Sequence, residues 1–480
     1  MFDFGIIPPL MFLGMVLFML YGFPVAFSLA AVGLFGMIGI ATGHFDAIFL
    51  EALPFRFYGI VGNELLLAIP FFTLMGAILE RCGLAEDLLE GTGRLFGGLP
   101  GGLAFAVVLV GAILGAITGT VAASVITMAM ISLPIMQRYG YNMRMATGVI
   151  AASGTIAQLI PPSLVLVVLA DQLGRSVGDM YKGAIGPSMI QVSIFLLFVA
   201  SMAILRPKSM PPLPKEVRGN LDLKLFATII KGMVPSALLM FLVLGTIFLG
   251  LATPTEAGAM GVVGAIVIAI VNRRLTWSLL RQSMETTARI TSMVVFILIG
   301  ATVFSLVFQG MNGGRWVEHM LTGLPGGKIG FLIFVNFFVF TLAFFLDFFE
   351  IAFIVVPMLV PVATALGIDL VWFGVMLCVN IQTSFMHPPF GFALFYLRGT
   401  ADASVKSSDI YLGALPWVGL QLIVVAIVLF WPESVTYWLD SGPKIDPSKI
   451  EIKIDLPTLG GDDGGGLNLP GLEMPPPVKQ

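Results

Sequence analysis

Apolar residues run in long stretches along most of the chain, and short turns with glycine, proline or charged residues separate them. An α-helix needs about 20 consecutive apolar residues to cross the hydrocarbon core of a bilayer. Most of the stretches approach that length, so the pattern predicts an all-α polytopic membrane protein. The predicted crossings fall at 6–21, 24–40, 57–80, 146–170, 184–205, 233–251, 255–272, 290–311, 369–397 and 409–432.

Two further apolar stretches, 97–136 and 328–364, are too long for one crossing. The centre of the first is rich in glycine, serine and threonine, and the second contains two acids. We interpret both as re-entrant helical hairpins, which enter the membrane and return to the side from which they came. The alternative is that each stretch makes two ordinary crossings.

Two proline pairs interrupt apolar stretches in the two halves of the chain. Both pairs end the same sequence frame, which has a leading proline, a glycine six residues later and a proline pair that starts 27 residues after the leading proline. The first frame is Pro134, Gly140 and Pro161–Pro162, and the second is Pro361, Gly367 and Pro388–Pro389. Prolines remove backbone donors and free carbonyls, which membrane helices tolerate only inside protein or beside water. Interrupted helices at corresponding places in two halves indicate the binding centre of a secondary transporter. The frame also predicts an inverted repeat, in which 97–170 superposes on 328–397 after a two-fold rotation in the membrane plane.

The predicted elements divide the chain into six parts. They are N-terminal scaffold helices (1–96), a first transport repeat of hairpin and broken helix (97–183), scaffold helices with polar loops (184–327), a second transport repeat (328–408), a last membrane helix (409–439) and a tail (440–480). The tail contains GGDDGGG and PPP and has no apolar periodicity, so we predict that it is disordered.

Composition and charge agree with a membrane protein. Of the 480 residues, 58% are hydrophobic and 11% are charged, and that charged fraction is about half the usual value for soluble domains. Nothing indicates a nucleic-acid partner. Basic residues gather at 206–231, at 273–289, around the first hairpin and after the second broken helix. Because basic loops stay in the cytoplasm, the first hairpin is predicted to enter from the cytoplasm and the second from outside.

Small residues with hydroxyl groups mark the first hairpin and the first broken helix. The candidate ligands are Thr118, Gly119, Thr120 and Ser124 at the hairpin tip, and Ser153, Gly154 and Thr155 before Pro161 and Pro162. Hydroxyl oxygens and freed carbonyls suit a hard cation such as sodium. This half offers neither histidine, cysteine nor carboxylate at the site, so zinc and copper are not expected. The alternative is that the small residues only allow helices to pack closely.

The second half has a different polar content. Its hairpin contains Asp347 and Glu350, and its broken helix contains Asn380, Gln382, Thr383, Ser384 and His387 before Pro388 and Pro389. An acidic side chain within an apolar membrane stretch costs free energy to bury, so its presence by default suggests a functional role. The two acids could support a cation, carry a proton or cap the hairpin tip. Asp347→Asn keeps size and hydrogen bonding but removes the charge, and we expect it to weaken transport strongly. A lone histidine such as His387 more commonly makes a structural hydrogen bond than carries a proton.

The segment 250–261 places Thr253, Pro254 and Glu256 between two apolar stretches, an arrangement typical of a helix N-cap. The functional alternative is that this segment braces a site. The sequence contains no Walker A loop, no Gly-x-Ser-x-Gly elbow and no His-Glu-x-x-His motif, which argues against ATP hydrolysis and common hydrolase chemistry. We therefore do not expect an enzyme.

Several segments together resemble the large membrane (permease) subunit of the tripartite ATP-independent periplasmic (TRAP) transporters. They are LLLAIPFFTLMGAILERCGLA (65–85), GAITGTVAASVITMAMISLPIM (115–136), ATGVIAASGTIAQLIPPS (146–163), TPTEAGA (253–259) and the stretch 346–399, which includes VNIQTSFMHPPFG. The stretch 346–399 is similar to the subgroup labelled mannitol/chloroaromatic, a label that does not define a substrate. The resemblance covers nearly the whole chain apart from the tail.

The resemblance implies an elevator-type symporter of the bacterial inner membrane that imports an organic anion, a carboxylate, driven by sodium ions. It implies two protein partners, a periplasmic binding protein that delivers the organic acid and a small four-helix membrane subunit. In the family, sodium lies at the hairpin tips and the facing broken helices. Carried over, this means 118–124 with 153–155, and 347–350 with 380–384. Thr118-Gly119-Thr120 stands where members often have Ser-Gly-Ser, and His387 stands where they usually have threonine, which leaves a proton role open.

Two other functions are compatible with parts of the sequence. A stand-alone sodium or proton antiporter or symporter would use Asp347, Glu350 and His387. A membrane scaffold without transport would have no need of matched helix breaks.

Overall fold

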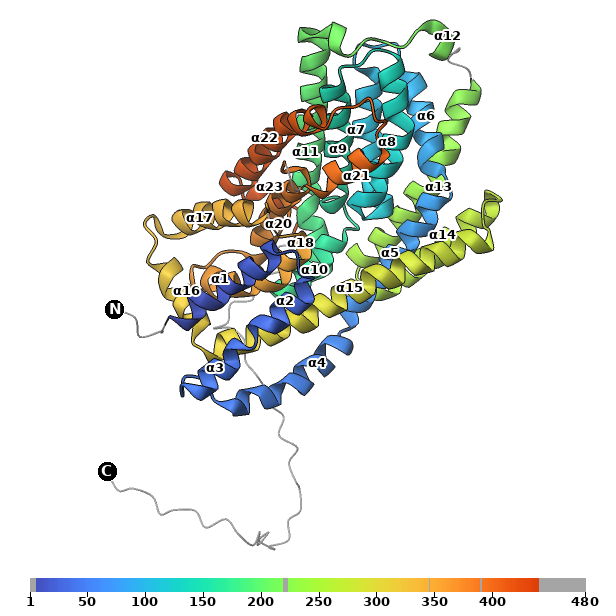
Figure 1. Ribbon diagram of the computed structural model, residues 1–480. Coiled ribbons are helices and arrows are strands. Elements are labelled where there is room, and N and C mark those ends of the chain that lie inside the picture. Colours follow the sequence, from blue (N-terminus) through green and yellow to red (C-terminus); the bar gives the residue numbers. More distant parts are fainter. Residues whose placement is uncertain (1–5, 219–222, 345, 389–390, 440–480) are drawn as a thin grey trace, which may run out of the picture. The chain divides into compact units, whose positions relative to one another are not determined.

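The computed structural model describes residues 6–218, 223–344, 346–388 and 391–439, and within these ranges all regular structure is helical. Figure 1 shows the arrangement of the helices. The tail 440–480, which we predicted to be disordered, lies outside the described residues, and so do Pro389 and Phe390.

The first half of the chain runs from α1 to the end of α11. Its helices are α1 (Ile7–Leu20), α2 (Val25–Val32), α3 (Phe35–Ala41), η1 (Ala47–Ala52), α4 (Leu53–Val61), α5 (Glu64–Arg81), α6 (Leu84–Phe96), α7 (Gly102–Thr118), α8 (Val121–Arg138), α9 (Met143–Thr155), η2 (Ile156–Gln158), α10 (Leu164–Leu173) and α11 (Val177–Leu205).

A linking region and the second half follow. They consist of η3 (Pro207–Ser209), α12 (Lys215–Arg218), α13 (Leu223–Phe248), α14 (Pro254–Val271), α15 (Trp277–Gly310), α16 (Gly313–Thr322), α17 (Gly327–Leu342), α18 (Phe348–Glu350), the π-helical η4 (Ile351–Val355), α19 (Val356–Ala365), α20 (Leu370–Ile381), η5 (Gln382–Met386), α21 (Phe392–Thr400), α22 (Ser407–Phe430) and α23 (Glu433–Thr436).

The two halves present the same order of elements. A long helix (α5 or α15) leads into a short polar-faced helix (α6 or α16), a hairpin (α7–α8 or α17–α19), a broken helix (α9–α10 or α20–α21) and a final long helix (α11 or α22). The broken helices even begin alike, because Asn142 and Asp369 are both N-caps and each lies eight residues after its leading proline. The predicted pairs of hairpins and broken helices are confirmed. Their superposition by a two-fold rotation stays a prediction.

Each hairpin packs against parts of both broken helices. α7 and α8 lie on α9, and α8 also contacts α21 from the other half, which Figure 1 shows beside it. In the second half, α17 packs on α20, while α18, η4 and α19 contact α10. This crossed packing brings each tip next to a helix break rather than past the far end of the broken helix, as expected for re-entrant hairpins.

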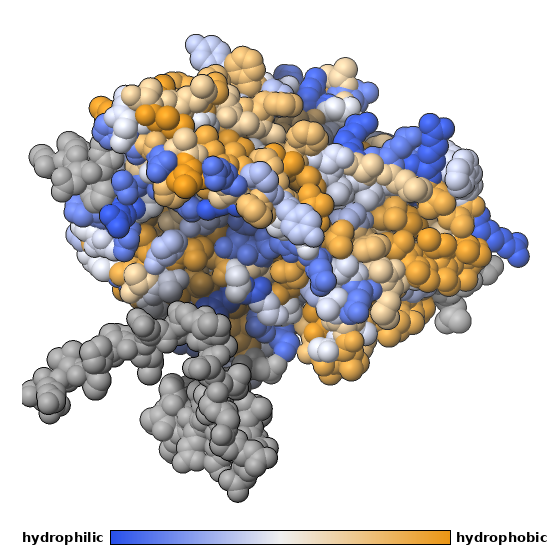
Figure 2. All heavy atoms as spheres, turned by 90° about the horizontal axis from the view of Figure 1, so that it is seen from below, coloured by the Kyte–Doolittle hydropathy of each residue, from blue (hydrophilic) through white to orange (hydrophobic). Residues whose placement is uncertain are grey.

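The molecule has the surface of a membrane protein. Among the described residues, six helices are long and apolar enough to cross a membrane, or up to eight if each of two bent helix pairs is counted as one span. Large side chains such as Phe241, Leu249 and Ile204 are at least 75% exposed. Figure 2 shows broad apolar areas on one face, on either side of a central hydrophilic region. Such areas are what lipid contact requires. The predicted multi-pass membrane protein is confirmed.

The N-cap predicted at the start of α14 is confirmed. Thr253 Oγ1 accepts from the Glu256 amide at 3.2 Å, and Glu256 Oε2 accepts from the Thr253 amide at 2.8 Å, which together form a capping box. Thr255 Oγ1 donates to the Glu64 carbonyl at 2.7 Å, so the same turn also fastens α14 to the start of α5.

Glycine lets α9 and α22 approach closely. A Cβ atom at Gly413 would lie 2.3 Å from the Arg144 carbonyl oxygen, and one at Gly148 would lie 2.2 Å from the Gly413 carbonyl oxygen. These neighbours are backbone atoms, which cannot rotate away. The crossing therefore depends on the absence of side chains, as in many membrane helix pairs.

Gly413→Ala is expected to lower the thermal stability of the detergent-solubilised protein by several degrees, because overpacking of a close contact typically costs about 1–3 kcal/mol. Gly419→Ala is the matched control, since Gly419 lies on the same helix and its added Cβ would have no neighbour within 4 Å. Light-scattering or intrinsic-fluorescence melting measures both. Equal melting temperatures for the two variants would contradict the close crossing.

Candidate binding site at the two helix breaks

The tip of the first hairpin is a two-residue turn between α7 and α8. Gly119 takes the left-handed conformation, with φ of +60°, and its amide donates to the Gly115 carbonyl. Thr120 is extended and forms the N-cap position of α8. A left-handed residue favours glycine, so Gly119 has a structural reason to stand here. Its added Cβ would lie 3.5 Å from the Pro162 carbonyl oxygen, which places the tip directly against the first break.

The first break lies between α9 and α10. The helix tightens into η2, passes Pro161 and Pro162, which are joined by a cis peptide bond, and restarts after Ser163. Ser163 Oγ caps α10, accepting from the amides of Val165 at 3.2 Å and Leu166 at 3.4 Å. Ser163 Oγ also donates to the Gln158 carbonyl, so a side chain holds the two sides of the break together.

Ser153 lies on the last turn of α9, between that helix and the first hairpin. A Cβ atom at Gly111 of α7 would lie 2.7 Å from Ser153 Cβ, and one at Gly154 would lie 2.2 Å from Val125 of α8. The small residues thus do allow close packing, as the structural alternative proposed. Close packing does not account for the Ser153 hydroxyl, which is fully buried and has no hydrogen-bond partner among the described residues.

The second break touches the first. Gln382, at the start of η5, is fully buried, and its Nε2 donates to the Thr155 carbonyl at 2.7 Å. Cys378 Sγ lies 3.5 Å from the Gln158 carbonyl. Two backbone carbonyls at the first break are therefore contacted by side chains of the second broken helix. The two interrupted helices form one buried polar centre.

Asn380 connects this centre to the second hairpin. Its Nδ2 donates to the Asn336 carbonyl at 2.7 Å and to Asn336 Oδ1 at 3.0 Å. Asn336 lies on α17 and is only 8% exposed. Asn336 was not among the residues predicted from the sequence, although it is the single polar residue in FLIFVNFFVF (331–340), a signal that could have identified it.

The polar residues of the two halves occupy matching positions. Ser153 and Asn380 each lie 19 residues after the leading proline of their frame, and Thr155 and Gln382 each lie 21 residues after it. The repeated frame therefore has a serine opposite an asparagine, and a threonine opposite a glutamine, at equivalent sequence positions.

Several unpaired buried oxygens lie at the breaks. Five oxygen atoms there have no hydrogen-bond partner among the described residues: Ser153 Oγ, Gln158 Oε1, Asn380 Oδ1, Gln382 Oε1 and Ser384 Oγ. By contrast, Thr155 Oγ1 and Thr383 Oγ1 donate to backbone carbonyls one turn back, at 2.8 and 2.7 Å. Burying an unpaired polar group typically costs about 1–3 kcal/mol. Oxygens of amide and hydroxyl type are ligands for a hard cation, so the residues present fit sodium.

The tip of the second hairpin is held by Asp347 and Glu350. Asp347 Oδ1 accepts from the Glu350 amide at 3.0 Å, and Glu350 Oε2 accepts from the Asp347 amide at 3.1 Å. This capping box confirms the capping alternative for these two acids. Neither carboxylate forms an ion pair with a base in the described part of the chain, although Glu350 is 6% exposed.

His387 lies between the second break and the second hairpin. Its ring packs against Phe340 at 4.4 Å and Phe344 at 4.3 Å between ring centroids, and the side chain is 1% exposed. The Ala343 carbonyl is near the ring, but neither ring nitrogen meets hydrogen-bond geometry with a described residue. Aromatic packing is thus the main contact of His387, and its structural hydrogen bond stays a prediction.

The structure brings together most of the predicted site residues. The residues that lie at the first break are Gly119, Ser153, Gly154, Thr155, Pro162 and Gln382. Ser124 is buried on α8. Asn380 reaches the second hairpin, while Asp347 and Glu350 bond to each other. The side chain of Thr118 and all of Pro389 lie outside the described part of the chain. No group of three or more His, Cys, Asp or Glu side chains that could hold a metal occurs among the described residues.

The amino-acid sequence of the chain is similar to those of known proteins. The family described as "Tripartite ATP-independent periplasmic transporter, DctM component" matches residues 12–434. The C4-dicarboxylate TRAP transporter large permease protein DctM of Vibrio cholerae is 30% identical over 460 residues, which cover 91% of this chain and 98% of that protein. The sialic acid TRAP transporter large permease protein SiaM of the same organism is 27% identical over 414 residues, covering 86% and 93%.

A solved structure shares the fold. The crystal structure of the Alcanivorax borkumensis YdaH transporter matches with a TM-score of 0.58 at 17% identity, over 81% of this chain and 89% of that chain. At 17% identity the match shows similarity of fold alone.

Proposed function

Because the chain belongs to the DctM family of tripartite ATP-independent periplasmic transporters, whose members are transporter permeases and not enzymes, we propose that it imports an organic anion with sodium as the coupling ion. The observation that carries the sodium part is the set of unpaired buried oxygens at the two touching breaks. The carboxylate nature of the anion is supported by the relatives, which are named for C4-dicarboxylates and sialic acid.

The orientation follows from the base of the first hairpin. The Gly101 and Asn142 amides donate to the carbonyls of Met210 at 2.8 Å and Ser209 at 2.9 Å, so both ends of the hairpin join the loop after α11. That loop contains Arg206 and Lys208. With basic loops in the cytoplasm, the first hairpin enters from the cytoplasm and the second from outside. The proposal includes a location in the bacterial inner membrane, with the second hairpin facing the periplasm.

Two partners belong to the proposal. A periplasmic binding protein would deliver the anion, and a small four-helix membrane subunit would complete the complex. The wide apolar surface of the described part leaves room for a membrane partner as well as lipid. The hairpins and broken helices, which pack on one another across the two halves, would move together as an elevator past α5, α14 and α15.

The alternative of a stand-alone antiporter gains no support from the geometry. Its two acids, Asp347 and Glu350, already bond to each other's amides in the capping box, and its histidine packs against aromatic rings.

Reconstitution in vesicles with the binding protein and the small subunit tests the function directly. Uptake should require a sodium gradient, should persist without a proton gradient and should fail when either partner is omitted. Uptake driven equally well by protons in sodium-free medium would refute sodium coupling. Uptake by the isolated subunit would refute the tripartite assembly.

Ser153→Ala is expected to raise the sodium concentration for half-maximal uptake about fivefold, because one hydrogen-bond-type contact is worth about 1 kcal/mol. Ser236→Ala is the matched control. Ser236 is also fully buried and its hydroxyl is also unpaired among the described residues, but it lies on α13, away from the breaks. A sodium dependence that is unchanged in Ser153→Ala, or equally changed in both variants, would remove Ser153 from the site.

A further inference from the structure

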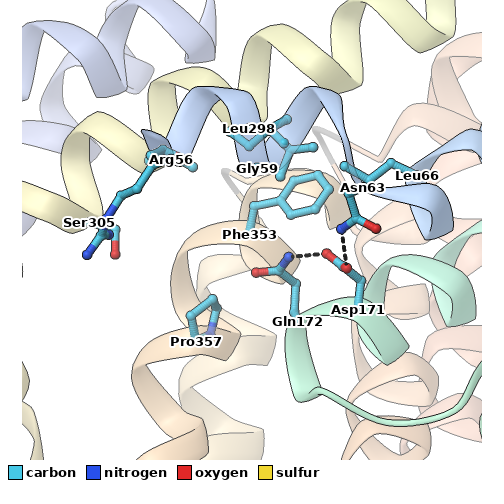
Figure 3. Close-up of a pocket in the computed structure, with 13 residues that line it drawn as sticks. Arg56, Gly59, Asn63, Leu66, Asp171, Gln172, Leu298, Ser305, Phe353 and Pro357 are labelled. Carbon is cyan, nitrogen blue, oxygen red and sulfur yellow. Dashed lines mark hydrogen bonds between the residues drawn. The ribbon is translucent and has the colours of Figure 1, made fainter. Parts of the chain in front are cut away.

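A cavity lies apart from the helix breaks, between the elements proposed to stay fixed and those proposed to move. It has a volume of about 420 Å³. Figure 3 shows its walls: Arg56 and Asn63 come from α4 and the start of α5, Ser305 from α15, Asp171 from α10 and Phe353 from the second hairpin. No candidate residue of the sequence analysis lines this cavity.

The cavity opens on the side of the membrane opposite the basic loop. Asp171 is near the end of α10, which leads directly into the start of α11 at Val177. The other end of α11 runs into the loop with Arg206 and Lys208. On the proposed orientation, the cavity therefore faces the periplasm, where the binding protein would release its anion.

The single acid of the cavity is already engaged. Asp171 Oδ1 accepts from Asn63 Nδ2 at 2.7 Å, and Asp171 Oδ2 accepts from Gln172 Nε2 at 2.8 Å (Figure 3). Both carboxylate oxygens thus have neutral donors from the cavity wall. These bonds also draw Asp171 towards Asn63, away from the end of the cavity that Arg56 occupies.

The single base of the cavity has no acidic partner. Arg56 Nη2 donates only to the neutral side chain of Gln309, at the long distance of 3.5 Å, and forms no ion pair with an acid in the described part of the chain. Gln309 lies one turn after Ser305 on α15, and Arg56 and Ser305 both line the cavity. The Ser305 hydroxyl is a second donor. A guanidinium and a hydroxyl at one end of a cavity present the donor pattern that a carboxylate accepts.

We propose that this cavity is a first binding site for the organic anion on the periplasmic side, in which a carboxylate binds Arg56 and Ser305 before the anion reaches the helix breaks. The inference rests on the proposed function for the identity and direction of its ligand. It adds a site to that function, and it assigns to Arg56 the task of attracting the anion. Arg56 is an exposed residue of the cavity wall, and a positive charge without an acidic partner raises the local concentration of anions and the rate at which they arrive.

Charged thiol reagents measure this potential without any transport. In a Ser305→Cys variant of the purified protein, the native cysteines Cys82 and Cys378 are buried and should react slowly. The probes are methanethiosulfonate reagents that carry either a sulfonate or a trimethylammonium group. Relative to a small thiol in solution, Cys at position 305 should favour the anionic reagent. Adding Arg56→Gln should lower the ratio of anionic to cationic rates about fivefold, the effect of one unit charge several ångströms away in a partly solvated site, whereas Arg56→Lys should preserve it.

Occupancy is tested with succinate as the carboxylate probe. Millimolar succinate should slow labelling of Ser305→Cys several-fold when Arg56 is present and should have no effect in the Arg56→Gln background. Succinamide and sodium chloride of equal ionic strength are the controls for shape and screening. Thr322→Cys, at the exposed end of α16 on the same side, should show neither the charge preference nor the protection.

The outcomes separate this inference from the proposed function. A rate ratio at position 305 that does not change with Arg56→Gln overturns the anion site, even if reconstituted uptake is normal. Protection by succinamide equal to that by succinate also overturns it. An intact charge preference and succinate protection support the site, whether or not uptake proves to be coupled to sodium.

Discussion

Gln382→Leu is expected to reduce sodium-driven uptake at least tenfold at an unchanged amount of folded protein. The glutamine joins the two breaks, since its Nε2 donates to the Thr155 carbonyl at 2.7 Å and its Oε1 is one of the unpaired oxygens. Leucine has a similar volume but offers neither group. It would remove one donor from a buried carbonyl, which costs about 0.5–1.5 kcal/mol, and would remove an oxygen from the proposed cation site.

The chain contains a matched control for this substitution. Gln421 on α22 is also fully buried, and both of its amide atoms lack partners among the described residues. Gln421→Leu should keep uptake and should leave the protein as stable as before or more stable, because it removes unpaired polar atoms and disturbs no bond. Uptake is measured as the initial rate in vesicles, normalised to protein that elutes as a single species. Equal losses in the two variants would show that a buried glutamine as such, and not the link between the breaks, is required.

The order of the elements could be predicted from the sequence because its signals are local. A proline pair breaks a helix wherever it stands, and the repeated frame of Pro134 and Pro361 revealed that the two halves correspond. The helix cap at Thr253 and Glu256 could also be predicted, since both partners lie within one helical turn. The long apolar stretches identified the membrane class for the same reason.

The partners within the site could not be predicted, because they come from distant parts of the chain. Gln382 meets Thr155 across 227 positions, and Asn63 meets Asp171 across 108. Nothing near Gln382 shows which carbonyl it will contact. The short helices α6 and α16 could not be predicted either, because their polar faces interrupt the apolar pattern. Hydrogen-bond partners within the fold could not be predicted either. Ser153 and Thr155 are both hydroxyl residues near the first break, yet only the Ser153 hydroxyl has no partner among the described residues.

The second hairpin tip yields the other large expected effect, and here the structure changes what the sequence suggested. Charge alone predicted that Asp347→Asn would be strongly impaired. In the structure the Asp347 side chain is an N-cap, and asparagine caps a helix about as well as aspartate does. We therefore expect Asp347→Asn to keep uptake within about threefold of the wild type, whereas Asp347→Ala should lower uptake about tenfold or more. Alanine cannot accept from the Glu350 amide, and the loss of an N-cap typically costs about 1 kcal/mol, to which the unpaired buried amide adds.

Asp369→Ala separates the role of the tip from the cost of losing any cap. Asp369 Oδ1 accepts from the Trp372 amide at 2.8 Å and caps α20, in the same half of the chain but away from the hairpin tip. Asp369→Ala should lower the melting temperature about as much as Asp347→Ala does, while the uptake rate per folded protein stays near that of the wild type. If Asp347→Asn instead loses as much uptake as Asp347→Ala, the carboxylate charge itself is needed. The tip would then have to be treated as part of a cation or proton site, because a cap of equal quality would have failed to replace it.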